Sequence, residues 1–594
     1  MSNYKLLKIL GLVAYSIIVT EKSAIATISS SLHRELEFAQ FPSPQDFEPP
    51  VPTVPQPSPQ PPPPAPDLAP SSPSFPPASP PEIDSDRIQL RGFEFEGNTA
   101  FPSEELEQKL VEFLNQSFTR SQLQEIVTQI RNLYYERGYR TTGIRLLVPD
   151  ETEQNREGIV KIEILEDEIE AIEILGTQRL NSGYVRSRLQ LATSKPLNTE
   201  RLQEALQLLQ RDPLIQSVRS RLSAAPNFPN KLLVVEIEEA PTFFPQMTLD
   251  NGRAPSIGSF QRRAGVTEAN VLGLGDGFTL YYTNTDGSNV LDLNYTVPIN
   301  PRNGTLQLHH SRVQTQVIEP DFEKLDIESA AQTYEITARQ PILQQFRDRA
   351  YREVALGFTF TRRESEVSLL GIPFPPLSVG ADELGRTRVS AFRFFQEWTL
   401  QNATEVIAAR SQFNLGVGLF DATINSPIPV TNEFVPDSRF FSWQGQAQWV
   451  KLLAPDTTLL VRSNVQLASR GLLPSEQFSA GGLGTVRGYR QDTLVGDNGF
   501  FASAELRIPL LSFSQPRSLL QVVPFADYAV AWNSSDRIAP NPNRLASVGV
   551  GLLWQIENLT ARLEYGIPLI STDTKARTWQ ENGILFSVQW NLGR

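Results

Sequence analysis

From about Phe243 onward the chain alternates apolar with polar or small side chains, and this pattern constrains the fold more than any other feature. In one example, Val354, Leu356, Phe358 and Phe360 are separated by single small or polar residues. The same alternation recurs at Leu291–Val297, Phe413–Leu419, Ala561–Ile567 and Phe586–Leu592. Successive side chains of a β-strand point to opposite faces, so the pattern predicts strands with one apolar and one polar face.

The alternation does not decide which way the apolar face points. In a soluble β-sandwich this face meets the core, whereas in an outer-membrane barrel it meets lipid and the polar face lines the lumen. Three features favour a transmembrane antiparallel β-barrel over residues 242–594: a secretory signal, aromatic residues near strand ends, and a chain that stops at its last strand. The aromatic residues are Tyr281, Tyr282, Trp443, Trp449, Trp532, Trp554 and Trp590. About 22 residues per strand with its connection predict about 16 strands.

Residues 1–26 predict a signal peptide. Lys5 and Lys8 precede an apolar run from Ile9 to Val19, and Ala24–Ala26 forms a small-residue cleavage site. An uncleaved anchor is the alternative, but the run is shorter than the roughly 20 residues that a membrane helix needs. No other stretch of the chain is as long and apolar, so we do not expect a helical membrane protein.

Two segments follow the signal without the pattern of a folded domain. Residues 27–40 give a weak indication of one short helix, and proline dominates residues 41–86. Such proline density favours an extended polyproline II conformation, so we expect a linker without a core of its own. A ligand for an SH3-type domain is the alternative, but such partners are not expected outside the cytoplasm.

Charge and composition argue against several classes of function. The net charge is -13 and no run of five or more Lys or Arg residues occurs, so we expect no nucleic-acid partner. The chain has no Cys and three His residues, His33, His309 and His310, which excludes disulfides and Cys/His metal sites. A Gly-x-Ser-x-Gly elbow is also missing. We therefore expect no enzyme activity, no catalytic residue, no cofactor, no metal and no small-molecule substrate.

Residues 87–166 change to an α+β pattern. Ile88–Phe95 predicts a strand, and Pro102–Leu114 and Ser121–Arg137 predict amphipathic helices. Thr142–Val148 and Gly158–Leu165 predict two further strands. The expected order of elements is therefore β-α-α-β-β.

The same order recurs over residues 167–241, which indicates an internal repeat. The turn at Phe95–Asn98 is echoed at Leu175–Gln178. Later elements of the second module are expected at Ser182–Leu191, Thr199–Arg211 and Leu232–Ile237. The tandem modules resemble two polypeptide-transport-associated (POTRA) domains, and Arg137–Tyr139 resembles the helix-to-strand junction common in them. Two generic α+β domains are the alternative.

A glycine-rich stretch between two strand patterns carries an arginine motif. It predicts a long, flexible loop with a rigid basic tip. The motif is Val486, Arg487, Gly488, Tyr489 and Arg490, and the turn after it contains Gly496, Asp497 and Gly499. This signature resembles that of the outer-membrane transporters of two-partner secretion, the haemolysin or filamentous-haemagglutinin secretion/activation proteins of TpsB type in the POTRA-barrel superfamily. The resemblance covers residues 87–594, and the proline-rich leader resembles cyanobacterial members.

The resemblance implies that the loop folds back into the barrel and places Arg487 against acidic residues of the inner wall. Glu505 is one candidate, because its neighbours Ala504 and Leu506 belong to the apolar face of their strand. Asp527 is the leading candidate, because its strand resembles the family's aromatic-x-Asp motif. An arginine fork binds carboxylates in a bidentate manner, which would hold the loop tip in one register. The alternative is that Arg487 only stabilises the barrel.

The resemblance also implies a function. We expect a monomeric pore in contact with outer-membrane lipid, with POTRA domains in the periplasm, that translocates an unfolded, β-rich secreted exoprotein to the cell surface. The sequence has no nucleotide-binding loop, so transport would not use nucleotide hydrolysis. An insertase for other barrels and a diffusion porin are the alternatives; two modules rather than three or five favour secretion.

A sheet edge of the first module is the expected place of client capture. An exposed edge strand can pair with an extended segment of the client by β-augmentation. The candidate client-binding residues are Thr142, Ile144, Leu146 and Val148. The groove of the second module is the rival site.

Overall fold

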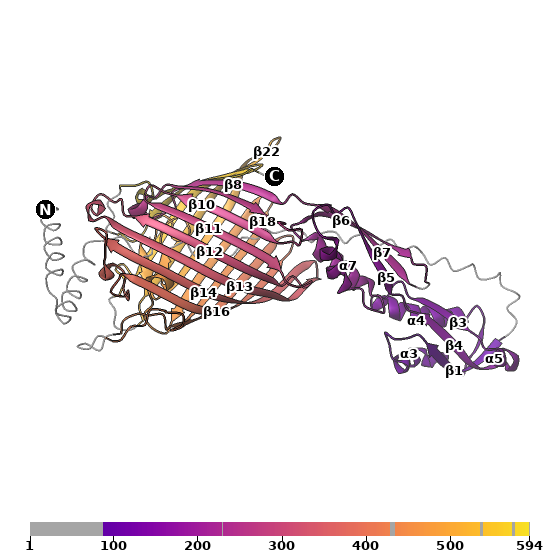
Figure 1. Cartoon of the computed structure of the whole chain (residues 1–594). Helices are drawn as coiled ribbons and strands as arrows, with labels where there is room; N and C mark the ends of the chain where they lie inside the picture. The colour runs from indigo at the N-terminus through magenta and orange to yellow at the C-terminus, as the bar shows by residue number, and fades with distance from the viewer. Residues whose placement is uncertain (1–86, 228–229, 428–433, 535–538, 573–576, 593–594) are drawn as a thin grey trace.

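The computed structural model describes residues 87–227, 230–427, 434–534, 539–572 and 577–592. Two α+β domains lead into a closed β-barrel, which confirms the predicted fold class (Figure 1). The predicted signal peptide, short helix and proline-rich linker lie outside the described residues. Within these ranges, no helix is long and apolar enough to cross a bilayer.

The first domain is a four-stranded sheet in the order β2-β1-β4-β3, covered by two helices. Its elements are β1 (Arg87–Glu96), α3 (Ser103–Leu110), β2 (Ser117–Thr119), α4 (Leu123–Glu136), β3 (Gly143–Leu147), α5 (Asp150–Asn155) and β4 (Glu157–Leu165). Leu106 and Ile130 from the helices pack against Val160 and Ile162 of β4. The predicted order lacked β2 and α5, because elements of three and six residues are too short to show a period.

The second domain repeats this arrangement. It comprises β5 (Ile169–Leu175), α6 (Ser182–Gln190), α7 (Thr199–Gln210), β6 (Ile215–Ala224) and β7 (Lys231–Glu239). β5 is parallel to β7 and β6 is antiparallel to it, as β1 and β3 are to β4. The two domains meet at Arg137 and Gly138, which lie between α4 and β3 of the first domain. There the amide of Thr199 donates to the Gly138 carbonyl at 2.9 Å.

An antiparallel barrel of 16 strands follows, and the described chain closes it by pairing β26 with β8. The strands are β8 (Phe243–Asp250), β9 (Gln261–Glu268), β10 (Gly277–Asn284), β11 (Ser288–Pro298), β12 (Thr305–Gln316), β13 (Ile327–Arg347), β14 (Ala350–Leu369), β16 (Arg386–Gln401), β17 (Glu405–Val417), β18 (Phe441–Ala454), β19 (Thr457–Ala468), β22 (Asn498–Ser514), β23 (Arg517–Trp532), β24 (Arg544–Ile556), β25 (Leu559–Pro568) and β26 (Ile584–Asn591). Two-residue β15 (Ile372–Pro373) extends the sheet beside β14.

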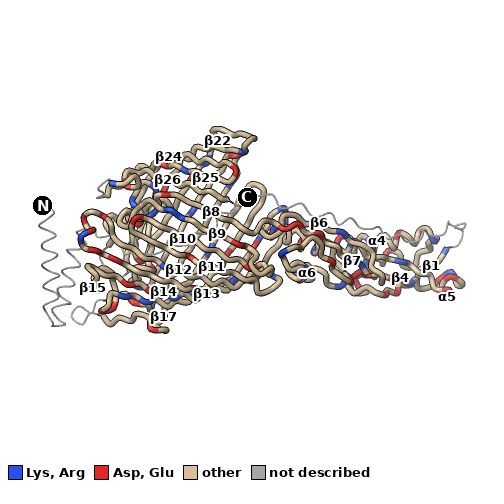
Figure 2. Tube along the Cα trace, turned by 45° about the horizontal axis from the view of Figure 1, so that its top comes forward, with Lys and Arg blue, Asp and Glu red and all other residues tan. Residues whose placement is uncertain are grey.

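The alternation of the sequence becomes an outer and an inner barrel face. Phe358 and Leu563 are exposed on the outside, whereas their neighbours Thr359 and Glu564 are buried inside. Charged positions concentrate on the two domains and toward the ends of the barrel, with long uncharged stretches along the strands between (Figure 2). This distribution suits a wall that faces lipid.

The second domain rests against successive turns at one end of the barrel, which we call the domain end; the opposite end is the far end. Polar contacts join α6, α7 and Arg211, the residue after α7, to three positions in or beside these turns. They are Arg188 Nε to Asn303 Oδ1 (3.0 Å), Arg211 Nη2 to Gln401 Oε1 (3.0 Å), and Phe346 N to Glu204 Oε1 (2.9 Å). The domain is therefore held at the pore mouth by several separate contacts.

Candidate functional site

The connection between β19 and β22, residues 469–497, turns from the far end into the lumen. It contains the short helix η6 (Pro474–Glu476) and a hairpin of β20 (Phe478–Ala480) with β21 (Leu494–Gly496). Apolar side chains of the loop pack against the inner wall. This cluster comprises Phe478, Ala480, Val486, Tyr489 and Leu494 of the loop with Phe501, Ala529, Ala531 and Leu545 of the wall. The loop predicted to be flexible is thus packed and partly regular in this structure.

Arg487 lies at the tip of the loop and is fully buried. Its guanidinium binds Asp527 in a bidentate manner, from Nε to Oδ2 at 2.8 Å and from Nη2 to Oδ1 at 2.9 Å. Nη1 also donates to Glu505 Oε2 at 3.0 Å and to Glu564 Oε1 at 2.7 Å. We call Arg487, Glu505, Asp527 and Glu564 the tip cluster. It ties one loop residue to β22, β23 and β25 at once.

Arginines of the wall balance the charge of the tip cluster. Three carboxylates around one guanidinium would leave uncompensated negative charge in a confined space. Arg507 Nη2 lies 2.6 Å from Glu505, and Arg562 lies 3.2 Å from Glu505 and 3.4 Å from Glu564. The guanidinium of Arg487 also stacks 3.6 Å from the centre of the Phe525 ring.

Asp527 and Glu505 were predicted from the sequence as partners of Arg487, whereas Glu564 was not. Its signal was present in the chain, because Leu563 and Tyr565 belong to the apolar face of their strand and Glu564 must then face the lumen. The aromatic-x-Asp resemblance directed attention to β23, and no comparable motif marks β25.

Gly488 allows the loop to touch the wall backbone. Its φ is +95°, and a Cβ added there would lie 2.8 Å from the carbonyl carbon of Gly566 on β25. Two glycines therefore meet face to face beside the tip cluster. Tyr489, also buried, donates from its hydroxyl to the Ala546 carbonyl at 2.7 Å and accepts from Ile570 N at 3.1 Å. Together, the close approach at Gly488 and the hydrogen bonds of Tyr489 hold the loop tip in a single position.

The remaining motif residues connect the loop to other parts of the barrel. Arg490 forms ion pairs with Glu319 at 2.9 Å and Glu581 at 3.6 Å, both in far-end loops. Asp497 is buried and accepts from the amides of Leu472 at 2.9 Å and Ser534 at 3.0 Å. A side chain would be crowded at Gly496, where a Cβ would lie 3.1 Å from Ala531, and it would not fit at Gly499, where a Cβ would enter the Phe478 ring.

The predicted client-binding strand is β3, which is at the edge of its sheet as expected. Ile144 is buried in the domain core, and Leu146 and Val148 pack against that core. Thr142 and Val148 lie just outside the strand. Only the backbone edge and the opposite face are therefore accessible to a client, because the period of two that makes the strand amphipathic turns these side chains inward.

Both histidines of the described chain lie on β12, and only His309 faces the lumen. His309 lies between Asp292 at 3.4 Å and Glu335 at 3.5 Å, while His310 on the outer face stacks on Tyr334. In the part of the chain that the structure describes, no group of three or more His, Cys, Asp or Glu residues is arranged to hold a metal ion. The absence of metal and cofactor remains a prediction.

Two α+β domains ahead of a closed barrel, with a loop folded into the lumen, define a POTRA-barrel transporter of the outer membrane. The model of the haemolysin secretion/activation protein ShlB/FhaC/HecB family matches residues 232–553, and a ShlB-type POTRA domain matches residues 88–167. The first match covers more than half of the chain. The protein therefore belongs to the ShlB/FhaC/HecB family, as its loop signature predicted.

Several named relatives support this assignment. The chain is 22% identical to the outer membrane transporter CdiB of Dickeya dadantii over 404 residues, 66% of this chain and 67% of the relative. It is 21% identical to the heme/hemopexin transporter protein HuxB of Haemophilus influenzae over 467 residues, 77% and 78% of the two chains. The solved structure of CdiB from Escherichia coli has the same fold, with a TM-score of 0.66, 17% identity, and 87% and 93% of the two chains covered.

Membership of this family establishes the class of function. The protein is an outer-membrane transporter of two-partner secretion, with its POTRA domains in the periplasm and an exoprotein as its partner. The domain end of the barrel is therefore periplasmic and the far end faces outward. The insertase and porin alternatives are not favoured. The family is one of transporters; the absence of any enzyme activity and the cyanobacterial origin remain predictions.

Proposed function

We propose that the protein exports an unfolded, β-rich exoprotein through its barrel and that loop 469–497 is the gate of this pore. The observation that carries the proposal is the tip cluster, in which one fully buried arginine binds carboxylates on three strands. Because the loop lies in the lumen, a client can pass only when the loop moves. The gate in this structure is closed.

The chemistry of the tip cluster suits a reversible closure. Removing one partner of a buried ion pair costs about 3–5 kcal/mol, and access of water to the lumen lowers this figure. Such a cost is large enough to keep the pore shut at rest. It is also within reach of a client that folds outside the cell, so export needs no nucleotide hydrolysis.

We assign capture of the client to the periplasmic domains. The edge of β3 offers unpaired backbone groups for β-augmentation. A polar pocket of about 480 Å³ beside α7 is the second candidate, since it lies between the first domain and the pore mouth. Its lining includes Arg137, Asn198, Glu200, Arg201, Glu204 and Phe346. We further propose that the barrel functions as a monomer surrounded by outer-membrane lipid.

The test compares Arg487→Ala with Arg517→Ala, which changes an exposed arginine at the domain end. Each variant is co-expressed with a candidate client, and export, single-channel conductance and heat-modifiability are measured. Without its charged partner groups the tip cannot return to one position after each opening, so we expect altered conductance and at least tenfold less export for Arg487→Ala. The barrel should still be heat-modifiable and the control unchanged. Normal export and conductance by Arg487→Ala would refute the gating role.

A further inference from the structure

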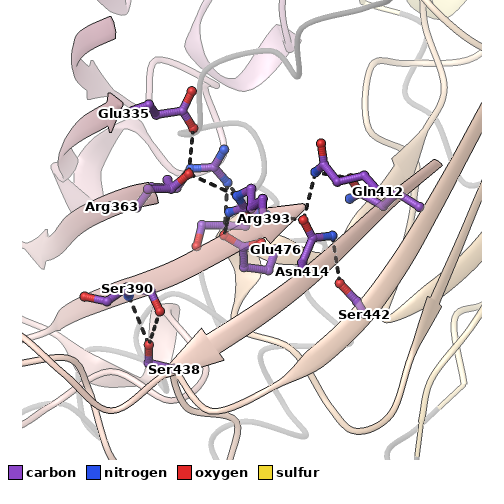
Figure 3. A network of polar contacts seen from close by, with 12 residues as sticks. Glu335, Arg363, Ser390, Arg393, Gln412, Asn414, Ser438, Ser442 and Glu476 are labelled. Carbon is purple, nitrogen blue, oxygen red and sulfur yellow. Dashed lines mark hydrogen bonds and ion pairs between the residues drawn. The ribbon is translucent and has the colours of Figure 1, made fainter. Parts of the chain in front are cut away.

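Loop 469–497 has a second charged attachment, at its beginning rather than at its tip. Glu476 ends η6 and is buried. Its Oε1 accepts from Arg393 Nη2 at 2.7 Å and from Arg363 Nη1 at 3.3 Å. Arg363 Nη1 also donates to the Ser475 carbonyl at 2.6 Å. We call Glu476, Arg363 and Arg393 the base cluster (Figure 3).

The wall holds the arginine side of the base cluster in place. Arg393 donates from Nε to Thr361 Oγ1 and from Nη1 to Asn414 Oδ1, both at 3.0 Å. Thr361 in turn donates to Glu335 at 3.1 Å, and Asn414 donates to Ser442 at 3.1 Å. These partners belong to β13, β14, β17 and β18, so a network of the wall orients the guanidinium (Figure 3). A donor that is oriented in advance loses little freedom when it binds.

The base and tip clusters lie on different walls. The base cluster uses β14 and β16, whereas the tip cluster uses β22, β23 and β25. In the order of the barrel, β17, β18 and β19 separate the two groups of strands. Between them, Gln466 Nε2 on β19 donates to the Glu476 carbonyl at 2.8 Å and to the Asp497 carbonyl at 3.1 Å. The loop therefore spans the lumen between two charged attachments.

We propose that the pairing of Glu476 with Arg363 and Arg393 is a second latch of the gate, and that both this latch and the tip cluster must be open before a client can pass. When only the tip is released, Glu476 still holds the beginning of the loop to β14 and β16. The pore is then partly obstructed. This proposal rests on the proposed gating function and extends it to three residues outside the loop motif.

A reversible cross-link tests whether the base must move. The chain has no Cys, so Glu476→Cys with Arg393→Cys is a unique pair. A short bis-thiosulfonate reagent then replaces the ion pair with a covalent link that a reductant cleaves. Linking is expected to reduce export at least tenfold, and reduction is expected to restore it to the level before linking. Thr337→Cys with Thr359→Cys links two paired wall residues and should leave export unchanged.

A charge-neutral variant tests the latch without a cross-link. Glu476→Gln keeps the shape of the side chain and removes its charge, so we expect severalfold more frequent channel openings with normal heat-modifiability. Asp421→Asn is the matched control, because Asp421 lies on an exposed far-end loop, where it pairs with Arg388 of β16. Normal export by the linked pair would overturn the second latch, and so would openings of Glu476→Gln at the wild-type frequency.

The two proposals fail in different ways. If Arg487→Ala impairs export while the linked Glu476–Arg393 pair transports normally, the tip gates alone and the second latch is wrong. If the linked pair blocks export while Arg487→Ala behaves as wild type, the base holds the gate and the role proposed for Arg487 is wrong. Normal behaviour of both variants would refute both proposals.

Discussion

The tip and base clusters have opposite charge arrangements. At the tip, a cation of the loop meets three carboxylates of the wall; at the base, a carboxylate of the loop meets two guanidinium groups of the wall. A loop that slid or turned around would place like charges together, which costs free energy in a confined space. The opposite charge arrangements therefore allow only one orientation of the loop, and they also hold the loop in place.

The clusters also differ in the number and geometry of their hydrogen bonds. Arg487 makes a bidentate pair with Asp527 and two further charged contacts between 2.7 and 3.0 Å. Glu476 uses a single oxygen, Oε1, for both of its arginines. Because bidentate, charge-assisted pairs are the stronger kind, we expect the base to open before the tip during export.

Reversal of the charges at the tip should have the largest effect. Arg487→Asp alone places a fourth carboxylate in the tip cluster, so we expect export to fall below a tenth of the wild-type level. Adding Asp527→Arg returns one opposite charge to the wall and should restore part of the export. Secretion of a co-expressed client measures both effects; no recovery in the double variant would contradict the pairing of these two residues in function.

A side chain at Gly566 should displace the loop tip by steric clash and leave the base cluster intact. Its Cβ would lie 2.5 Å from Gly488 N, a backbone atom that cannot yield without moving the tip. We expect Gly566→Ala to increase channel openings severalfold while the base stays attached. Gly484→Ala is the control in the same loop, because a Cβ there meets nothing within 4 Å. Equal conductance of the two variants would argue against close packing at the tip.

Weakening the wall network should affect the base alone. Thr361→Val removes the hydroxyl that links Glu335 to Arg393, at a cost of about 1 kcal/mol, equivalent to about fivefold in an equilibrium. We expect a rise in opening frequency of this size or less, with no change in cross-linking between engineered cysteines at the tip. Thr359→Val, two residues earlier on β14, serves as control. A larger rise in opening frequency than for Gly566→Ala would show that the base cluster, and not the tip cluster, holds the loop more strongly.

The smallest expected effect concerns a looser ion pair outside the barrel. This pair serves as a reference for the ion pairs of both clusters. Between the two POTRA domains, Lys231 Nζ lies 3.7 Å from Asp167 Oδ2, and burial raises the pKa of Asp167 to about 6 despite the lysine. The folded state then binds a proton more tightly than the unfolded chain. This stabilisation is complete below about pH 4 and disappears as the pH rises through about 6.

Hydrogen exchange measures this dependence on the full-length protein. Peptides around residue 167 should be more protected at pH 5 than at pH 7, by about 1 kcal/mol in opening free energy after correction for intrinsic exchange. Asp167→Asn should remove the difference. A pH dependence that persists in this variant would assign it to another group.

Much of the fold was predictable from local pattern. The period of two placed residues on the correct barrel face, and it also indicated that Glu505 faces the lumen. The repeat was visible from helical and strand periods that each span one element, although strand β6 of the second domain was not predicted. Short elements such as β2 and α5 escaped, because three to six residues are not enough to show a period.

Sequence by itself determined which side chains face the lumen, since facing depends only on the parity of positions along a strand. Only the tertiary structure decided which of these residues meet. No sequence motif marks Glu564, Glu476, Arg363 or Arg393 as partners, and 113 positions separate Arg363 from Glu476. Their meeting depends on barrel register, closure and the path of the loop across the lumen, which are set by contacts between distant strands.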